Sequence, residues 1–251
     1  MSKIIAITNQ KGGVGKTTTV INLACALHNR GKKILVVDFD PQGNCTSGMG
    51  VDKSTSNGIY DVLINGVDTE KAIVSTRYGD VLPSSKALAG AGIEMIGLED
   101  RQFLLKRALA QVADHYDFIF IDCPPSLELL TLNALCAANS LLVPLQGEYY
   151  ALEGLSDLMN TVRIVRRGMN PYLFIEGVPL TMFDGRTNLN LQVAQEVKRF
   201  FPGKVYSTVI PRNVRLSEAP SHGKPITAYD RTCRGAEAYV ALANEFLKKN
   251  S

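Results

Sequence analysis

The sequence lacks the long apolar runs and paired cysteines that would indicate a membrane protein or a disulfide scaffold. No uninterrupted apolar stretch approaches the roughly 18 residues that a membrane-spanning helix needs. The first residues, MSKIIAIT, carry no basic leader region and no cleavage site. The five cysteines are widely spaced and include no CxxC pair, which disfavours both a disulfide framework and a zinc ribbon. We therefore expect a cytoplasmic protein whose cysteines are reduced and packed as small apolar side chains.

The chain also has no Pro/Ser-rich linker, no internal repeat and no low-complexity tract. With 251 residues, of which 45% are apolar, it is long enough to bury one sizeable core. These features predict a single domain over residues 1–251. We expect no amino-terminal helix-turn-helix domain, because none fits before Lys3.

Charge is unevenly distributed along the chain. Residues 1–162 hold 13 Lys and Arg against 17 Asp and Glu, a net charge of −4, whereas residues 163–251 hold 14 against 7, a net charge of +7. A basic last third suggests an anionic partner such as nucleic acid or a membrane surface. A solvated basic face with no partner is the alternative explanation.

Six short apolar segments have the length and composition of buried β-strands. Their apolar residues are consecutive instead of alternating, as is typical of strands covered on both faces of a parallel sheet. The predicted strands span residues 4–8, 34–38, 118–122, 141–145, 174–181 and 205–211.

Segments with helical periodicity lie between these strands. The first places apolar residues such as Val20 and Leu27 on one stripe and ends at Gly31. The alternation of strands and helices predicts an α/β fold, in which a doubly wound, mostly parallel sheet is flanked by helices and binds ligands at the carboxyl ends of its strands. The predicted helices span residues 16–31, 98–116, 126–139, 151–167 and 188–201.

A glycine-rich loop, KGGVGKTT, lies between the first predicted strand and the first predicted helix. Glycines let successive backbone N–H groups turn toward phosphate oxygens, and the helix amino terminus adds a positive dipole. We expect Lys16 to reach the β- and γ-phosphates of a nucleotide and the Thr17 hydroxyl to ligate Mg²⁺. The predicted phosphate-binding residues are Gly12, Gly13, Val14, Gly15, Lys16, Thr17 and Thr18.

This loop departs from the common pattern G-x-x-x-x-G-K-[ST], because Gln10 stands at the first glycine position and a second lysine, Lys11, follows it. Two cations on the same side of an empty site repel each other, so Lys11 gains little by serving its own loop. Presented to the site of a second subunit, Lys11 could neutralise charge on the transferred phosphoryl group, as an arginine finger does.

Two predicted strands end in aspartates. The segment VVDFDPQGN contains Asp38 and Asp40, and FIFIDCPPS contains Asp122. A carboxylate at the end of an apolar strand can orient Mg²⁺ directly or through a water molecule. Either segment alone is weak support, because such an aspartate more often caps a helix or a turn. Together with the glycine-rich loop, the two segments predict a nucleotide and metal site.

Together these motifs resemble the P-loop ATPases of the ParA/MinD type, which have a deviant Walker A loop. The resemblance is closest to the ParA/Soj branch of chromosome- and plasmid-partitioning ATPases. It implies an ATPase with weak basal activity that uses ATP and Mg²⁺. The matching segments occur in order over essentially the whole chain and are KGGVGKTTT, VDFDPQGN, DCPPSL, PLQGEYYALEGL, TMFDGRTN and VIPRNVRLSEAPSHGKPI.

The resemblance also implies roles for individual residues. Lys11 matches a signature lysine that reaches the phosphates bound by the other subunit of an ATP-loaded sandwich dimer. Asp122 matches the Walker B aspartate, and Asp40 matches the first switch near the metal and the attacking water. Pro211 and Asn213 match positions that contact adenine, whose edge an Asn amide can pair with as donor and acceptor. The implied catalytic residues are Lys11, Lys16, Asp40 and Asp122, and the implied metal residues are Thr17, Asp40 and Asp122.

The branch implies an ATP-bound homodimer that binds double-stranded DNA without sequence preference and associates with the nucleoid. A centromere-binding partner of the ParB/Spo0J type would stimulate hydrolysis and release the DNA. Phosphate contacts carry affinity without reading sequence, and dimerisation would duplicate them. The candidate DNA contacts are Arg186, Lys198, Arg199, Arg215, Lys224 and Arg231, of which Arg186 and Arg215 lie within the branch's motifs.

Other members of the superfamily fit less well. A MinD-type regulator would carry a carboxyl-terminal amphipathic membrane helix, whereas GAEAYVALANEFLKKNS is more simply a core helix, so we expect no membrane binding. An electron carrier related to nitrogenase reductase would need paired cluster cysteines. An ATP-driven switch that acts on a protein partner, such as a replication initiator or an array-positioning system, is the remaining alternative.

Overall fold

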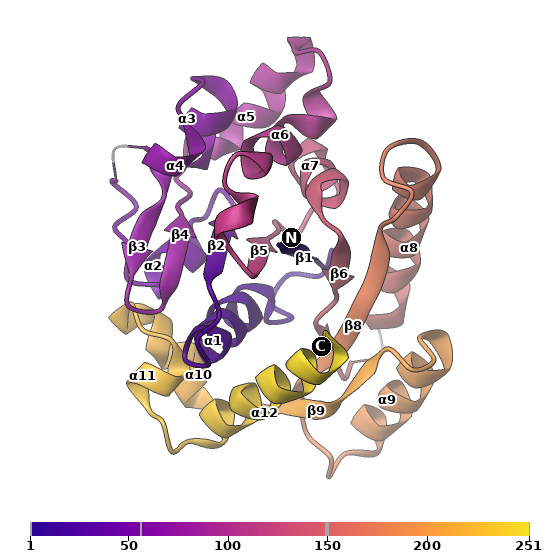
Figure 1. The fold of residues 1–251 in the computed structure, drawn as a ribbon. Helices are drawn as coiled ribbons and strands as arrows, with labels where there is room; N and C mark the ends of the chain where they lie inside the picture. The colour runs from indigo at the N-terminus through magenta and orange to yellow at the C-terminus, as the bar shows by residue number, and fades with distance from the viewer. Residues whose placement is uncertain (1, 56, 149–150, 251) are drawn as a thin grey trace.

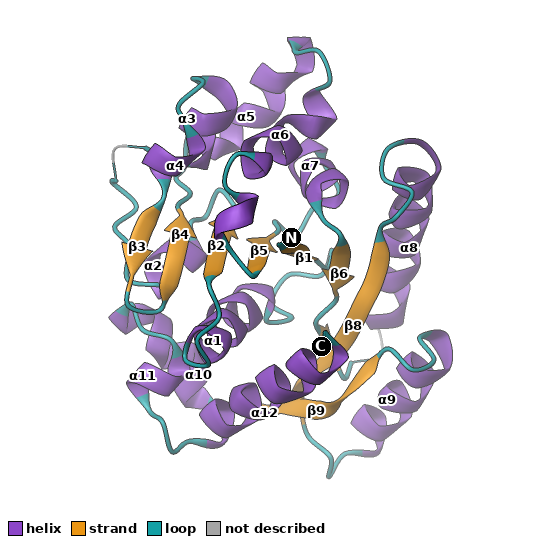
Figure 2. Ribbon diagram, viewed as in Figure 1, coloured by secondary structure: helices purple, strands orange, loops and turns teal. Residues whose placement is uncertain are grey.

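A mostly parallel β-sheet runs through the molecule and carries helices on both faces (Figures 1 and 2). The computed structural model describes residues 2–55, 57–148 and 151–250. Within these residues the strand order is β3-β4-β2-β5-β1-β6-β8-β7, with β9 paired to β8. Only β3 and β4 pair in antiparallel fashion among the described strands. The predicted α/β fold with a doubly wound, mostly parallel sheet is therefore confirmed.

The six predicted strands are present, and two further strands form a short hairpin at one edge of the sheet. The strand predicted over residues 141–145 is divided into two pieces, both of which pair with β8. The described strands are β1 (Lys3–Ile7), β2 (Ile34–Asp38), β3 (Val74–Thr76), β4 (Gly79–Leu82), β5 (Phe118–Asp122), β6 (Ser140–Leu142), β7 (Leu145–Gln146), β8 (Phe174–Phe183) and β9 (Val205–Pro211).

Helices connect these strands, and several of them are short. The α-helices are α1 (Lys16–His28), α2 (Asn44–Gly48), α3 (Ile59–Ile64), α4 (Thr69–Ala72), α5 (Leu88–Glu94), α6 (Leu104–Ala110), α7 (Leu129–Ala137), α8 (Ala151–Gly168), α9 (Asn188–Phe200), α10 (Val214–Glu218), α11 (Ile226–Tyr229) and α12 (Arg234–Lys249). The short 3₁₀ turns are η1 (Met95–Gly97), η2 (Arg101–Phe103), η3 (Ala113–His115) and η4 (Ala219–His222).

The prediction of one continuous helix over residues 98–116 was wrong. This segment forms η2, α6 and η3 in succession, and only α6 is α-helical. The break is stabilised by Asn133 of α7, which donates a hydrogen bond to the Arg101 carbonyl (2.9 Å) and accepts one from the Leu105 N–H (3.2 Å). A side chain distant in sequence therefore satisfies the backbone where the helical pattern is interrupted.

The apolar stripe predicted for helix α1 is buried, and the burial extends to the residues beside it. Every residue from Thr19 to Leu27 is buried. One side of α1 faces the sheet, and α12 covers another, where the hydroxyls of Thr19 and Tyr239 lie 3.2 Å apart. The predicted stop is confirmed, since the helix ends at His28 and Gly31 adopts a positive φ of 78°.

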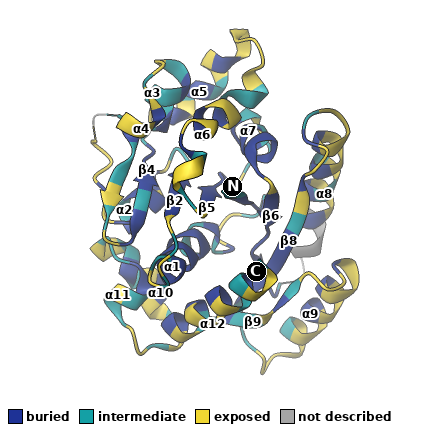
Figure 3. Cartoon of the chain, in the orientation of Figure 1, coloured by how far each residue is buried: buried dark blue, intermediate teal, exposed yellow. Residues whose placement is uncertain are grey.

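The consecutive apolar residues of the central strands contribute to two separate cores, one on each face of the sheet. In β1, Ala6 contributes to the core beneath α3, α5, α6 and α7, whereas Ile5 and Ile7 contribute to the core beneath α1 and α12. In β5, Ile121 and Phe120 divide in the same way. Figure 3 shows these strands as the most buried part of the molecule. Both faces of the sheet are therefore covered, which explains the absence of alternation in the sequence.

The first strand and the last helix are joined by a buried carboxylate. Glu176 in β8 pairs with Lys3 (2.6 Å) and accepts hydrogen bonds from Ser140 (2.8 Å) and Asn250 (2.9 Å). Burial alone would raise the pKa of Glu176, but the hydrogen bonds from Lys3 and Ser140 outweigh it and lower the pKa. Among the described residues no helix has the length and apolar character needed to span a membrane.

Gly177 in β8 contacts the core that lies beneath α1 and α12, and it shows how tightly this core is packed. A Cβ atom on Gly177 would lie 2.3 Å from Cε2 of Tyr206, and Tyr206 is only 1% exposed. We predict that Gly177→Ala lowers the free energy of unfolding by about 1–3 kcal/mol because the ring cannot move aside. Urea denaturation measures this difference.

The matched control is Gly168→Ala at the end of α8, where a new Cβ meets nothing within 4 Å. This variant should be as stable as the wild type or slightly more stable. Equal stability of the two variants would show that the packing argument is wrong.

Candidate active site

The glycine-rich loop joins β1 to α1 and leaves backbone donors free. Gly13 and Gly15 have φ angles of 74° and 85°, a left-handed conformation that side chains with a Cβ adopt at a cost. Gly15 is the N-cap residue of α1, and no side chain caps the helix there. The first N–H groups of a 13-residue helix are therefore available to an anion.

Lys16, the first residue of α1, is a largely buried cation. Its side chain donates a hydrogen bond to the Lys11 carbonyl (3.2 Å), and the residue is 7% exposed. Burial lowers the pKa of Lys16, while Asp122 and Asp40 act in the opposite direction. Such a cation is stabilised further by any anion that enters the loop.

Two aspartates lie side by side at the carboxyl ends of β2 and β5, because the parallel register places Asp38 beside Asp122. Asp38 is fully buried and accepts hydrogen bonds from the Thr46 N–H (2.7 Å) and hydroxyl (2.6 Å). Burial raises the pKa of Asp38 to about 6, although the bonds from Thr46 oppose this shift. Asp38 is thus a structural partner of α2, a role that the sequence pattern did not reveal.

Asp122 has a different environment. It is fully buried, and neither carboxylate oxygen has a hydrogen-bond partner among the described residues. Burial raises the pKa of Asp122 well above its usual range, and Asp38 adds to the shift. Thr17 and Lys16 lower it, although neither meets hydrogen-bond geometry with Asp122. A buried carboxylate without a donor fits a site that a cation completes.

The donor set around Asp122 fits Mg²⁺ better than a metal held by protein alone. Among the described residues, no cluster of three or more His, Cys, Asp or Glu side chains could hold an ion. Mg²⁺ is commonly bound by one or two carboxylates together with phosphate oxygens and water. Asp40 is half-buried, and its carboxylate accepts the Gln42 N–H (2.9 Å). Thr17, Asp40 and Asp122 thus offer the few oxygen ligands that such an ion needs.

A cavity of 480 Å³ extends from the glycine-rich loop to the residues that follow β9. Gly15, Thr17 and Thr18 line one part of it, and Pro211 and Asn213 line another. The structure therefore brings both predicted base-contacting residues to the same cavity as the loop. The Asn213 side-chain oxygen caps α10 by accepting the Arg215 N–H (2.9 Å), and its NH₂ group has no acceptor in the part of the chain that the structure describes.

Eleven of the sixteen residues that line this cavity were not identified from the sequence, and Thr181, Met182 and Arg212 are among them. Thr181 contacts the glycine-rich loop at two points. Its hydroxyl donates a hydrogen bond to the Val14 carbonyl (2.8 Å), and its methyl group lies near Gly15. Met182 has a positive φ of 49°, and Arg212 precedes the capping Asn213. Neither Thr181 nor Met182 belongs to a residue type that signals ligand binding. Arg212 could have been selected from the basic last third of the chain.

Lys11 does not stay free in the single subunit. Its ammonium group pairs with the Glu148 carboxylate at 2.5 Å, and the two side chains are 32% and 46% exposed. Asn9 fixes the backbone by accepting the Lys11 N–H (3.0 Å). Glu148 lies in the segment PLQGEYYALEGL, but a pair between residues so distant in sequence could not be predicted from that segment.

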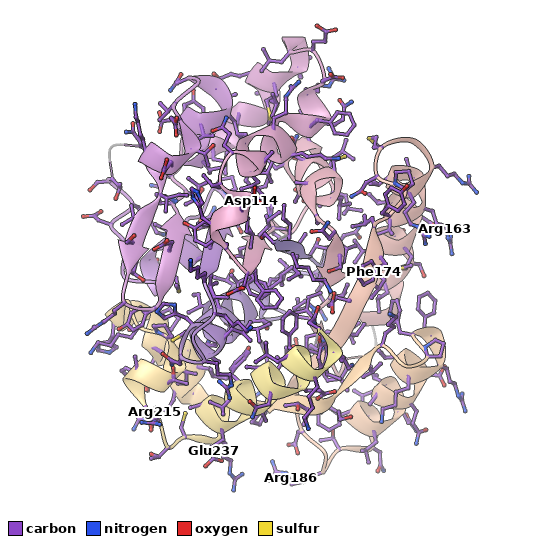
Figure 4. The ribbon with its side chains drawn as sticks, viewed as in Figure 1. Asp114, Arg163, Phe174, Arg186, Arg215 and Glu237 are labelled. Atoms are coloured by element: carbon purple, nitrogen blue, oxygen red, sulfur yellow. The ribbon has the colours of Figure 1, made fainter. Side chains whose placement is uncertain are left out.

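The six basic residues proposed for DNA contact are exposed or half-buried, and they fall into two groups. Three belong to the loop before α9 and to α9 itself, namely Arg186, Lys198 and Arg199. The others surround α10 and α11, namely Arg215, Lys224 and Arg231. Figure 4 shows Arg186 and Arg215 along the same lower margin of the molecule. Several pair with carboxylates, as in Arg186–Asp184 (2.7 Å) and Arg215–Glu218 (2.8 Å).

The chain is similar to known proteins over nearly its whole length. The family described as "AAA domain" matches residues 2–175. The chain is 58% identical over 248 residues to the sporulation initiation inhibitor protein Soj of Bacillus subtilis (strain 168), covering 98% of each chain. It is 50% identical over 254 residues to the chromosome partitioning protein ParA of Myxococcus xanthus (strain DK1622), covering 100% of this chain and 90% of that protein.

A solved structure with the same arrangement is cobyrinic acid a,c-diamide synthase from Mycobacterium smegmatis with bound ADP and magnesium. The two structures superpose with a TM-score of 0.86 at 36% sequence identity, covering 99% of this chain and 95% of the other.

The link between Asp38 and Thr46 can be tested in the nucleotide-free protein. The Thr46 hydroxyl donates to Asp38 and accepts the Ser84 N–H (2.9 Å). We predict that Thr46→Val lowers the free energy of unfolding by about 2–3 kcal/mol, because two buried polar groups lose a partner. Thr46→Ser keeps the hydroxyl and is the control. Urea titration of the variants measures the difference.

The same pair predicts a pH dependence. Because the folded-state pKa of Asp38 is raised to about 6, its favourable contribution is present at low pH and is lost as the pH rises through that value. Thr46→Val removes a bond to the ionised form, so its deficit should be smaller at about pH 5 than at about pH 7. If Thr46→Val lowers the free energy of unfolding equally at both pH values, Thr46 does not stabilise the ionised form of Asp38.

Proposed function

The chain belongs to the ParA/Soj family of chromosome-partitioning ATPases, and we propose that it segregates DNA by cycling between an ATP-bound dimer that holds duplex DNA and a form that releases it. The observation that carries this proposal is the charge arrangement at the strand ends. A buried lysine, uncapped helix N–H groups and an aspartate without a hydrogen-bond partner among the described residues lie together, and they complement a triphosphate with Mg²⁺.

This geometry supports the proposed roles in ATP hydrolysis, except that of Asp40, which rests on the resemblance. Lys16 and the backbone of the loop bind the β- and γ-phosphates, and Thr17 and Asp122 hold Mg²⁺, which neutralises charge on the phosphate oxygens. Asp40 lies where the chain leaves β2 and orients the attacking water. Pro211 and Asn213 hold adenine, with the Asn213 NH₂ group as the donor to the base.

Dimerisation would give Lys11 its function. In the single subunit Lys11 pairs with Glu148, and both side chains are partly exposed. Such a pair contributes only about 0–1 kcal/mol, because water screens it. The triphosphate of a second subunit carries more negative charge than one carboxylate, so it can replace Glu148 as the partner of Lys11. The pair therefore keeps Lys11 near the surface, and Lys11 does not bind the phosphates in its own subunit.

DNA binding would depend on the basic residues of the last third of the chain. Each subunit offers only a few exposed cations near Arg186 and Arg215, and several of them already pair with carboxylates. Two copies in one dimer bind a continuous duplex with higher avidity than one copy. We further propose that a partner of the ParB/Spo0J type stimulates hydrolysis and so separates the dimer from the nucleoid.

Duplex DNA binding with ATP and with ADP is the experiment that tests this function. The wild type should bind random-sequence duplex in ATP, and Arg215→Glu should weaken binding by at least about tenfold, because the dimer then loses two phosphate contacts and gains repulsion. Arg107→Glu on α6 is the control, since its side chain is also exposed and makes only long contacts among the described residues, with Asp100 at 3.8 Å and with the Glu99 carbonyl at 3.4 Å. DNA binding that is absent, or equal in ATP and ADP, would favour a switch that acts on a protein partner.

The Lys11 pair supplies a test of the dimer. In a background carrying Asp40→Ala to slow turnover, Lys11→Ala should bind ATP and remain monomeric. Glu148→Gln should dimerise at an ATP concentration lower by about two- to fivefold, because the competing pair is lost. Light scattering during size-exclusion chromatography measures both. The assignment of Lys11 is wrong if Lys11→Ala dimerises as readily as its parent.

A further inference from the structure

Asn9 joins the start of the glycine-rich loop to the segment that follows β6. The strands β1 and β6 are neighbours in the sheet (Figure 1), and their parallel register places Ile7 beside Leu142. Asn9 and Pro144 each follow two residues later, so they leave the sheet at the same level. Pro144 has no N–H with which to continue the ladder, and the Asn9 side chain donates to its carbonyl at 2.9 Å.

Both polar atoms of the Asn9 side chain are used. The residue is buried, with 4% of its surface exposed. Its Nδ2 group donates to Pro144, and its Oδ1 atom accepts the Lys11 N–H at 3.0 Å. A buried amide that is paired at both ends is a rigid link, because moving it would leave a polar group unsatisfied away from water. The backbone of Lys11 is thus fixed to the segment after β6.

The other polar group of the Lys11 backbone is held as well. The Lys16 ammonium donates to the Lys11 carbonyl at 3.2 Å. An ammonium group has three donors, so Lys16 can keep this bond and still bind phosphate oxygens. Asn9 and Lys16 therefore hold the N–H and the carbonyl of one residue from either side of it in the sequence.

Glu148, the partner of the Lys11 side chain in the single subunit, lies on the segment that Asn9 contacts. The chain passes from Pro144 through β7, and the Glu148 N–H donates to the Gln146 carbonyl at 2.8 Å. Asn9 therefore sets the position of the Lys11 backbone relative to the carboxylate that pairs with its ammonium group.

A lysine that acts on another subunit depends on how firmly its backbone is held. The side chain is long and flexible, and any freedom at its base adds to the conformational entropy that is lost when the ammonium group binds a phosphate. A misplacement of about 1 Å can also cost about 100-fold in rate. The two residues that follow Lys11 are glycines, which restrict the backbone little. Asn9 supplies the restriction that these glycines do not.

We propose that Asn9 is a positioning residue for Lys11, which it holds so that the ammonium group can extend to the phosphates of a second subunit. The role of Lys11 between subunits belongs to the proposed function, on which this assignment rests. Asn9 itself contacts no phosphate in this assignment. Its loss therefore weakens dimerisation and turnover and leaves ATP binding by the single subunit intact.

Asn9→Ala tests this assignment in the full-length protein. In the Asp40→Ala background, the dissociation constant of the ATP dimer should rise by about tenfold or more, because two lysines per dimer lose their fixed backbone. In the background with Asp40 intact, turnover at saturating ATP should fall by about tenfold or more. The affinity of dilute, monomeric protein for a fluorescent ATP analogue should change by less than about threefold. Light scattering, phosphate release and fluorescence titration measure the three quantities.

Asn170→Ala is the matched control. Asn170 is also a buried asparagine, and its Nδ2 group holds the carbonyls of Leu135 (2.9 Å) and Ala138 (2.7 Å) before β6, at the opposite edge of the sheet. This variant should lose stability in urea, as Asn9→Ala does, and should dimerise and hydrolyse ATP as the wild type does. If Asn9→Ala does not fold, Asn9→Val takes its place, because it fills similar space without a polar group.

Two comparisons distinguish the positioning of Lys11 from a general effect on the loop. Asn9→Ser retains a side-chain oxygen that can accept an N–H two residues later, so it should dimerise more readily than Asn9→Ala. In protein that carries Lys11→Ala, adding Asn9→Ala should not lower the residual turnover further, because the residue through which Asn9 acts is absent.

Several results would overturn the proposal. These are dimerisation of Asn9→Ala equal to that of its parent, loss of monomer ATP affinity in proportion to the loss of dimer, equal defects in Asn9→Ser and Asn9→Ala, and additive effects of Asn9→Ala and Lys11→Ala. If Lys11→Ala dimerises as readily as its parent, the proposed dimer contact and the assignment of Asn9 are both wrong. If Lys11→Ala stays monomeric and Asn9→Ala dimerises normally, only the assignment of Asn9 is wrong.

Discussion

The balance of buried charge at the ends of β2 and β5 is the constraint on which the rest of the site depends. The parallel register places two carboxylates side by side in the interior, and the nearest cation, Lys16, is itself buried. Asp38 is stabilised by hydrogen bonds from α2, whereas Asp122 has no donor among the described residues. Mg²⁺ bound to a phosphate chain would supply both a cation for Asp122 and an anion for Lys16.

Much of the fold could be predicted because its determinants are local. Consecutive apolar residues such as Ile119–Ile121 identified strands covered on both faces, and the glycine-rich loop was identified by residues that are adjacent in sequence. The aspartates could be placed at strand ends from the same pattern. Cysteine usage was also predictable, since four of the five cysteines are buried and all five are free.

The features that could not be predicted depend on contacts between distant segments. Asn133 divides the helix expected over residues 98–116, and the burial of α1 on all sides requires α12 to cover it. The strands β3 and β4 are too short to give a clear pattern. The Lys11–Glu148 pair likewise requires the end of β7 to return to the glycine-rich loop. Roles drawn from the resemblance alone, such as those of Asp40 and the basic residues, stay predictions.

The cluster around Glu176 has a practical consequence for following the protein in cells. Because Lys3 and Asn250 both contact this carboxylate, the two ends of the described chain lie together at the amino edge of the sheet (Figure 1). The glycine-rich loop lies at the opposite, carboxyl edge. A fluorescent protein fused to either end would therefore be held away from the phosphates, and a flexible linker between the two ends would be short enough for circular permutation.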